Sequence, residues 1–464
     1  MKLFSSYHSL SRARRMTVMF LLWLLPLVLG WAGLIVLSHQ TTQWAILWTQ
    51  RLFGWMLLMT YVGLWILAIG FSRQPRLTVF RGIAGTITLS VLILCLEVPA
   101  FLKFVHWGLV FDRISGEPQN YVWAYLPDNE LDFRRRPNDH WEGLLSSDIE
   151  FGWLLPRSRQ EPLVFTYDQW GYRNSMNLNH ADVALIGDSY VEGWYVSDTE
   201  TTAQRLQTHL GRPVINLGVA GYGTQQEFLV LKKDAIQFNP KVVIFFFFEG
   251  NDLYDDNRFE KSVLSGTTPV LSKHPNPLGL AWTKDRKQSS FTYNVLRRFR
   301  RFSNSVLPNN YPYSGQLTTP GQSGQIVHFA DYASKPWSEF EAGRWKKTRD
   351  TLAQVSEISK TQGIHVLFTF VPIKFRVYQP FVIFPPDSPC VTWRVWPTTE
   401  LFLEFCQSTG VPCLDLTKPF QEHVRGGGMP YSPVDSHWSP QGHAFVADLL
   451  AAELSRRGWL TDVP

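Results

Sequence analysis

The sequence predicts an α/β protein built on a doubly wound, five-stranded parallel sheet and preceded by three transmembrane helices. Two observations lead to this prediction. From about residue 181 onward, short apolar runs alternate with segments of helical spacing, which is typical of a parallel sheet covered by helices. Long stretches without any charged residue lie closer to the N-terminus. The chain therefore divides into a membrane anchor (1–104), a lead-in region (105–180) that we expect to pack on the main domain, and the main domain itself (181–464).

Three segments of the anchor are predicted to span the membrane, at about 16–38, 52–71 and 82–102. The first two hold no charged residue and the third holds only Glu97, and each approaches the roughly 20 apolar residues that cross a hydrocarbon core. The first segment is too long for a removed signal peptide and lacks a small-residue cleavage site. We therefore interpret it as a retained helix.

The positive charge of the chain lies in this anchor. The whole chain has 44 basic and 39 acidic side chains, a formal charge of +5, but residues 1–104 contain nine of the basic side chains and one acid. Seven of these basic residues precede the first segment or lie between the second and third, whereas Arg51 lies at the edge of the second segment and Lys103 follows the third. Basic residues in short loops stay in the cytoplasm. We expect a multi-pass protein of the inner or plasma membrane with a cytoplasmic N-terminus and an extracytoplasmic main domain. A third segment that failed to span would leave that domain cytoplasmic.

Composition excludes several classes of protein. With 45% apolar residues the chain is neither disordered nor collagen-like, and four cysteines are too few for a disulfide scaffold. An oxidising compartment would permit one bridge among Cys390, Cys406 and Cys413, and the sequence does not indicate which pair. Since the main domain carries no excess of basic residues, and no phosphate loop or dinucleotide fingerprint is present, we expect no nucleic-acid partner.

Five apolar runs are predicted to form the sheet, at 183–187, 214–217, 242–248, 364–371 and 411–416. The third run is uninterrupted and contains four phenylalanines, which fits a central strand buried on both faces. The helices predicted between and after the strands are 201–210, 227–238, 338–361, 400–408, and a last helix with Ser439 as N-cap, Pro440 at its first position and Gly458 just past its end.

Residues 253–337 interrupt this alternation with polar, proline-rich sequence. We interpret them as an insertion at the carboxyl edge of the strands, where this kind of fold places its sites. Within the insertion, the arginine-rich run 297–301 is interpreted as a solvated helix face, with contact to anionic lipid or polymer as the alternative.

Four short motifs lie at predicted strand ends or before a helix. They are Gly187-Asp188-Ser189 after the first strand, the glycine-rich turn 216–223 after the second, Glu249-Gly-Asn251-Asp252 after the third, and Asp435-Ser-His437 before the last helix. Each alone has an ordinary interpretation as a cap, a turn or a surface pair. Together they supply a hydroxyl, backbone donors, an amide and a carboxylate-oriented imidazole, which is the set that acyl-ester chemistry needs. No companion ligands at metal spacing accompany the Asp-x-His pair.

In this order the four blocks resemble the SGNH/GDSL hydrolase family, over roughly residues 180–455. The resemblance implies a flavodoxin-like sheet and a serine mechanism without a metal or other cofactor. It implies Ser189 as the nucleophile, His437 as the general base and Asp435 as the partner that orients the base. It further implies an oxyanion hole made of the backbone N–H groups of Ser189 and Gly221 and the side-chain amide of Asn251, with Asp188 in a supporting role.

This sequence departs from the family pattern in two places. It reads GDSY in place of GDSL, at a position that packs, and Asp-x-His where many members have Asp-x-x-His. The rival base, His443, falls inside the last predicted helix. The segment Val371-Pro-Ile-Lys374, together with Tyr378, resembles a strand-end segment of bacterial members that act on exported polysaccharides.

We therefore expect a membrane-anchored, extracytoplasmic serine hydrolase that cleaves acyl esters, in particular O-acetyl esters on a glycan, through an acyl-serine intermediate. Three alternatives stay open at this point. They are an O-acetyltransferase for an exported polysaccharide, working with a membrane partner protein; a lipid or thioester hydrolase; and a non-catalytic docking module.

Overall fold

The computed structural model describes residues 61–65, 74–102, 104–108, 110–111, 125–153, 155–265, 289–306 and 311–460. The chain forms two compact units. One comprises residues 1–99 with two short pieces near 310 and 388, and the other comprises most of residues 100–464.

The first unit contains one long apolar helix, α4 (Pro75–Phe101), which includes nearly all of the predicted segment 82–102. Among the described residues, Arg76–Phe101 is the one helix long and apolar enough to cross a membrane, and almost none of it is buried. The predicted segments 16–38 and 52–71 lie outside the described residues, apart from a helical turn at 61–65. The described residues therefore show one of the three predicted spans, and the other two stay predictions.

The second unit is organised by a sheet of five strands: β5 (Val183–Ile186), β6 (Val214–Asn216), β7 (Val242–Phe248), β10 (His365–Val371) and β12 (Cys413–Asp415). Their order is β12-β10-β7-β5-β6, and every neighbouring pair is parallel. Numbered along the chain this is the order 2-1-3-4-5, the flavodoxin-like arrangement. The predicted doubly wound, five-stranded parallel sheet is confirmed.

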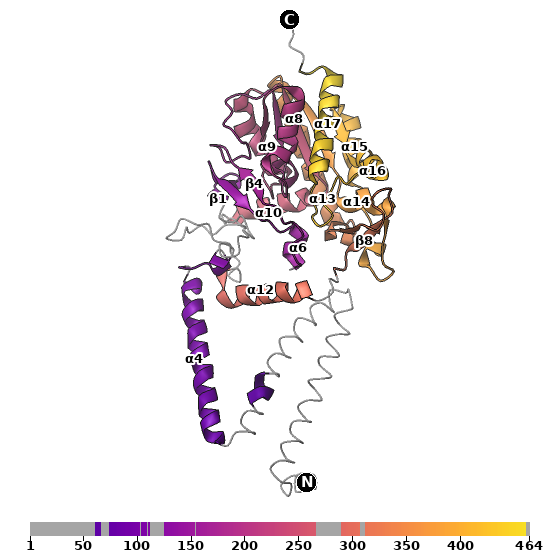
Figure 1. The fold of residues 1–464 in the computed structure, drawn as a ribbon. Helices are drawn as coiled ribbons and strands as arrows, with labels where there is room; N and C mark the ends of the chain where they lie inside the picture. Colours follow the sequence, from indigo (N-terminus) through magenta and orange to yellow (C-terminus); the bar gives the residue numbers. More distant parts are fainter. Residues whose placement is uncertain are drawn as a thin grey trace. The chain divides into compact units, whose positions relative to one another are not determined.

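The sheet is covered by helices that begin and end close to the predicted residues: α8 (Thr202–Leu210), α9 (Thr224–Val230), α13 (Glu339–Thr361), α15 (Thr398–Thr409) and α17 (Pro440–Arg457). Helices α8 and α17 pack against each other, whereas α9 and α13 pack together with α10 (Asp252–Ser265) (Figure 1). The caps predicted for α17 are present, with Ser439 accepting from the Gly442 N–H and Gly458 in the left-handed conformation.

One predicted helix differs from the structure, and another helix of the structure was not expected. The helix expected at 227–238 begins three residues earlier, because Gly223 ends the glycine-rich turn, and its second half is a π turn (Leu231–Ala235) and a 3₁₀ turn (Ile236–Phe238). The helix α16 (Thr417–Arg425) was not predicted.

The insertion 253–337 is partly regular. It continues α10 and contains α12 (Phe291–Val306), β8 (Ser314–Leu317), β9 (Ile326–His328) and a 3₁₀ turn (Asp331–Ser334). Strand β8 also pairs with β11 (Val382–Ile383), which follows β10 and a short helix α14 (Lys374–Tyr378), so the small antiparallel sheet joins the insertion to the carboxyl side of β10.

The lead-in region supplies two antiparallel strand pairs and a short helix. Strand β1 (Tyr125–Asp128) pairs with β2 (Asp132–Arg135), and β3 (His140–Gly143) pairs with β4 (Leu163–Thr166). The helix α6 (Asp148–Trp153) lies between them in sequence. Leu163 and Phe165 of β4 form a small core with Tyr195, which follows the first motif.

Candidate active site

Ser189 stands at the turn between β5 and the short helix α7 (Ser189–Glu192). Gly187 makes this turn possible, because a Cβ atom there would lie 2.5 Å from a methyl group of Val191. The side chain of Asp188 caps α7 by accepting from the Tyr190 N–H at 2.9 Å, and its other oxygen lies 3.4 Å from Ser189 Oγ. Asp188 is thus a helix cap whose carboxylate also contacts the serine hydroxyl.

A hydrogen-bonded chain joins Ser189 to the loop before α17. Ser189 Oγ lies 2.8 Å from His437 Nε2, and His437 Nδ1 lies 2.6 Å from Asp435 Oδ1. The same Asp435 oxygen accepts the backbone N–H of His437 at 2.8 Å, which is how an Asp-x-His spacing orients the ring. All three residues are less than a tenth exposed. Since Nδ1 faces a carboxylate it is the protonated nitrogen, and the Nε2 lone pair faces the hydroxyl.

The charges around His437 favour its protonated form. Burial disfavours the imidazolium, but the negative charge of Asp435 outweighs this and raises the pKa of His437 to about 9. The carboxylates of Asp148 and Asp188 act in the same direction. An imidazolium formed when the serine loses its proton is therefore well stabilised, as a general base requires.

The two predicted oxyanion donors lie on the strands that flank β5. Gly221 follows β6 and Asn251 follows β7, and these strands are the two neighbours of β5, so all three motifs lie at the same edge of the sheet. Gly221 has a φ of 83°, which glycine adopts without strain. The Asn251 amide donates one N–H to Asp255 Oδ2 at 2.7 Å, which fixes its orientation and leaves its second N–H available. Their roles toward an oxyanion stay predictions.

Glu192, which the sequence analysis did not single out, holds the turn that contains Gly221. It is fully buried, accepts the backbone N–H of Ala220, and pairs with Arg135 Nη2 at 2.8 Å. It also accepts the Tyr167 hydroxyl at 2.6 Å. The lead-in region thereby contacts the turn that contains Gly221 through one buried carboxylate. The sequence signal that could have indicated Glu192 is its position as an acidic residue in the otherwise apolar segment after Ser189.

Asp148 of the lead-in region holds the loop that contains the base. Its backbone N–H donates to Asp435 Oδ2 at 2.8 Å, and its carboxylate accepts the N–H of Ser436 at 3.0 Å and the Ser436 hydroxyl. Burial and the charge of Asp435 raise the pKa of Asp148 to about 7. No sequence motif indicated this residue, because it lies 287 positions from Asp435.

Lys374 holds the same loop from the strand β10 side. Its Nζ donates to three backbone carbonyls, those of Ser432, Pro433 at 3.0 Å and Asp435 at 3.1 Å. The side chain is buried, and burial lowers the pKa of Lys374 to about 7 against the opposing charges of Asp435 and Asp148. The tyrosine of the GDSY motif adds a fourth contact, because the Tyr190 hydroxyl donates to Ser436 O at 2.8 Å.

Asp148, Asp435 and His437 are also the one group of described residues with three potential metal ligands close together. A cation there would compete with the hydrogen bond between His437 Nδ1 and Asp435 Oδ1. The proton-transfer roles of His437 and Asp435 stay predictions.

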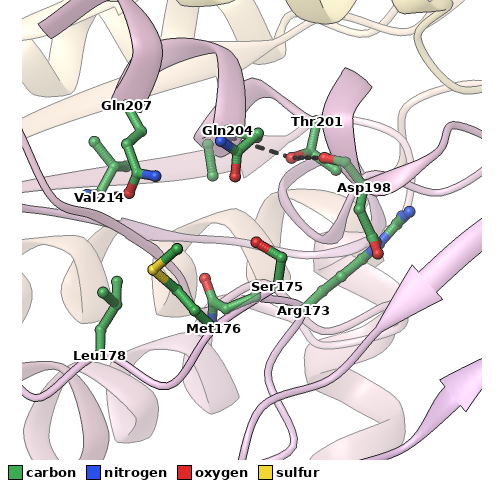
Figure 2. Close-up of a pocket in the computed structure, with 11 residues that line it drawn as sticks. Arg173, Ser175, Met176, Leu178, Asp198, Thr201, Gln204, Gln207 and Val214 are labelled. Carbon is green, nitrogen blue, oxygen red and sulfur yellow. Dashed lines mark hydrogen bonds and ion pairs between the residues drawn. The ribbon is translucent and has the colours of Figure 1, made fainter. Parts of the chain in front are cut away.

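The rival base His443 and a pocket beside α8 both lie away from the hydrogen-bonded chain. His443 is fully buried in α17, with Nδ1 2.8 Å from Thr202 Oγ1, and burial lowers its pKa to about 3. It is a packed helical histidine. A pocket beside α8, shown in Figure 2, is lined by residues 173–176 and Leu178 together with Asp198, Thr201 and Gln204, and by none of the three residues of the hydrogen-bonded chain. Arg173 Nε binds Asp198 at 2.9 Å on its wall.

Comparisons with known proteins cover most of the main domain. The model of the GDSL-like lipase/acylhydrolase family matches residues 185–445. No curated protein matches the chain. The similar solved structures include an acetyl xylan esterase, with 14% identity over 59% of this chain and 98% of that one and a TM-score of 0.32. They also include a GDSL-like lipase from Bacteroides thetaiotaomicron, with 12% identity over 59% of this chain and 88% of that one and a TM-score of 0.29. A two-domain esterase active on acetylated mannans shares 12% identity over 61% of this chain and 52% of that one, with a TM-score of 0.31.

Proposed function

Because the chain belongs to the GDSL-like lipase/acylhydrolase family and is a serine ester hydrolase, we propose that it removes acyl groups, in particular O-acetyl groups, from a glycan outside the cytoplasm while tethered to the membrane. The observation on which the catalytic part rests is the hydrogen-bonded chain from Ser189 Oγ through His437 to Asp435.

In the proposed reaction, His437 Nε2 takes the Ser189 proton as the serine oxygen forms a bond to the ester carbonyl carbon. The N–H groups of Ser189 and Gly221 and the Asn251 amide stabilise the tetrahedral oxyanion. His437 then gives its proton to the departing sugar oxygen, and an acyl-serine remains. A water molecule, deprotonated by His437, attacks that ester, releases the carboxylic acid and restores the serine hydroxyl.

Two features support a site outside the cytoplasm. Cys406 and Cys413 form a disulfide bond, and such bonds persist in oxidising compartments. The basic residues before and between the predicted spans also favour an extracytoplasmic main domain.

The glycan part of the proposal rests on that location and on the segment 371–378, which resembles segments of members that act on exported polysaccharides. Two of its polar residues, Lys374 and Tyr378, contact the residues just before His437. Lys374 does so through three carbonyls, and Tyr378 accepts the N–H of Tyr431 at 3.2 Å.

Acetate release tests the reaction. Purified full-length protein in detergent is incubated with acetylated xylan, with and without an unacetylated acceptor sugar, beside the Ser189→Ala variant. We expect free acetate from the wild type alone. Acetyl transfer to the acceptor in place of acetate release would favour the transferase, and a preference for long-chain acyl esters would favour the lipid hydrolase.

A topology reporter fused after Pro464 tests the location. We expect the signal of an extracytoplasmic reporter. A cytoplasmic signal would overturn the location and, with it, the glycan substrate, but not the hydrolase chemistry.

A further inference from the structure

The helix α12 turns an apolar stripe outward. Val295, Leu296 and Phe299 are 40%, 56% and 50% exposed, and Tyr293 at the margin is also exposed. Positions separated by three and four residues lie on one face of a helix, so these side chains form a continuous outer stripe. The expectation that this helix presents a solvated, charged face is therefore wrong for its outermost side.

Three polar side chains of α12, those of Asn294, Arg297 and Arg301, lie toward the protein instead, whereas Thr292 is exposed beside the stripe. Asn294 is 2% exposed, the Arg297 guanidinium lies 4.0 Å from the centre of the Phe151 ring, and Arg301 Nη2 donates to Ser146 Oγ at 3.0 Å. A surface helix of a protein that meets only water shows the opposite arrangement, with its apolar stripe inward. This reversal indicates that the outer face of α12 meets something apolar.

The charge of α12 indicates what that surface is. The helix contains four arginines and no acidic residue. At 100° per residue, Arg298 and Arg300 lie at the two margins of the apolar stripe, and the Arg298 guanidinium stacks on the Phe111 ring, 4.7 Å from its centre. Apolar residues at the centre with basic residues at both margins suit a helix that lies in the interface of an anionic bilayer, where long basic side chains reach the phosphates.

The contacts at the start of α12 join it to residues that follow α4 in the sequence. The Phe291 ring lies 5.1 Å from the Trp107 ring and 5.8 Å from the Phe111 ring, measured between centroids. Trp107 follows Phe101, the last residue of α4, by six positions, and six extended residues reach about 20 Å at most. If α4 crosses the membrane, α12 is tied near its surface, and tryptophan is common at that level.

We propose that α12 lies in the membrane interface, with its stripe of Tyr293, Val295, Leu296 and Phe299 inserted below the headgroups and with Arg300 at the level of anionic phosphates. The inference rests on the proposed membrane tether. It assigns the main domain a second membrane contact, which would hold the domain at the bilayer surface.

Site-specific fluorescence in lipid nanodiscs tests this. The full chain, with Cys95→Ser and Cys390→Ser to remove the free thiols, is labelled with an environment-sensitive dye at Leu296→Cys, at Ile87→Cys in α4, or at Ala353→Cys on the exposed side of α13. The discs contain phosphatidylglycerol and phosphatidylcholine, with or without a nitroxide on the acyl chain. Unchanged aryl acetate turnover shows that each labelled protein is folded.

We expect the acyl-chain nitroxide to quench the dye at positions 87 and 296 several-fold more than the dye at position 353. We also expect quenching at 296, but not at 87, to fall when phosphatidylcholine replaces the anionic lipid. Quenching at 87 without quenching at 296 would overturn the inference and leave the tether intact, and quenching at neither position would overturn both. A dye at 296 that is shielded from a water-soluble quencher yet not quenched by the lipid would show that protein covers the stripe, and would also overturn the inference.

Discussion

Ser189 and Asn251 are predicted to contribute to the reaction in different degrees. Loss of the nucleophile removes the covalent route, whereas loss of one oxyanion donor leaves the others in place. We expect Ser189→Ala to abolish turnover of an aryl acetate and Asn251→Ala to lower kcat by about 100-fold or more. Wild-type turnover by purified Ser189→Ala protein would refute the assignment of the nucleophile. Asn251→Asp is a matched control, since it keeps the size of the side chain and removes its N–H groups.

The pH dependence of the reaction is also a residue-scale property. The base must be neutral in the free enzyme, and the pKa of His437 is raised to about 9, so kcat/KM should rise with pH until about pH 9. Removal of a nearby negative charge lowers the pKa of a histidine. We therefore expect Asp148→Asn to move this rise to lower pH, as measured by kcat/KM profiles.

Ser436→Ala is the matched control for that variant, because it removes one hydrogen bond to the Asp148 carboxylate and leaves its charge. Its profile should rise at the wild-type pH. An identical shift in both variants would mean that Asp148 acts through geometry alone.

Short sequence motifs predicted the three residues of the hydrogen-bonded chain but not the residues that hold them in place. Ser189, Asp435 and His437 could be found because each lies in a short motif beside a strand or helix. Asp148 lies in no motif, and the contacts of Glu192 and Lys374 could not be predicted, because the partners of all three lie far away in sequence and only the folded chain brings them together. A local pattern also cannot tell a packed histidine such as His443 from a reacting one.

At the scale of elements, the loop 432–437 is held by Asp148 of the lead-in region, Tyr190 of α7 and Lys374 of α14, and Lys374 binds three of its backbone carbonyls. Lys374→Met keeps the length of the apolar stem and leaves three buried carbonyls without their donor. Misplacement of the base should lower kcat on the order of 10-fold, and the unpaired carbonyls should lower stability by about 1–3 kcal/mol.

Steady-state kinetics and thermal unfolding of the same Lys374→Met preparation measure these two effects. Lys374→Arg should recover part of the activity, since it restores a cationic donor. Full activity of the methionine variant would show that the loop holds its own shape.

The disulfide bond staples the end of α15 to β12. Cys406 and Cys413 are seven positions apart, and a loop of that size stabilises the folded state by about 2–3 kcal/mol through the unfolded chain. We expect the free energy of unfolding of the Cys406→Ala/Cys413→Ala variant, measured by urea denaturation, to be lower by this amount. Reductant should reproduce the effect in the wild type and leave the double variant unchanged; a wild type that is insensitive to reductant would contradict the bond.

Elements with strong local signals were predictable. The buried run 242–248 is a strand over the predicted residues, and α17 has its predicted caps. The end of the helix that follows Gly223 was harder to predict, because a π turn and a 3₁₀ turn interrupt the helix without a proline or glycine to mark them. The strands of the insertion and the lead-in region are three or four residues long, too short for a period to appear.

At the scale of the whole molecule, the charge of the chain separates into two parts. The basic excess belongs to residues 1–104, and the remaining residues hold 35 basic and 38 acidic side chains. This distribution predicts orientation in a membrane, and α4 is the described helix suited to span it. The fold of the main domain follows from its strand order. The inward orientation of Arg297 and Arg301 in α12 was not predictable, because it depends on Phe151 and Ser146 of the lead-in region.

The central claim is that Ser189 is a nucleophile activated by His437. It is tested most directly by treating the full-length protein with a fluorophosphonate and locating the adduct by mass spectrometry. We expect one adduct on Ser189 in the wild type and a greatly reduced labelling rate in His437→Ala. Labelling of another residue, or undiminished labelling of the Ser189→Ala variant, would contradict the account.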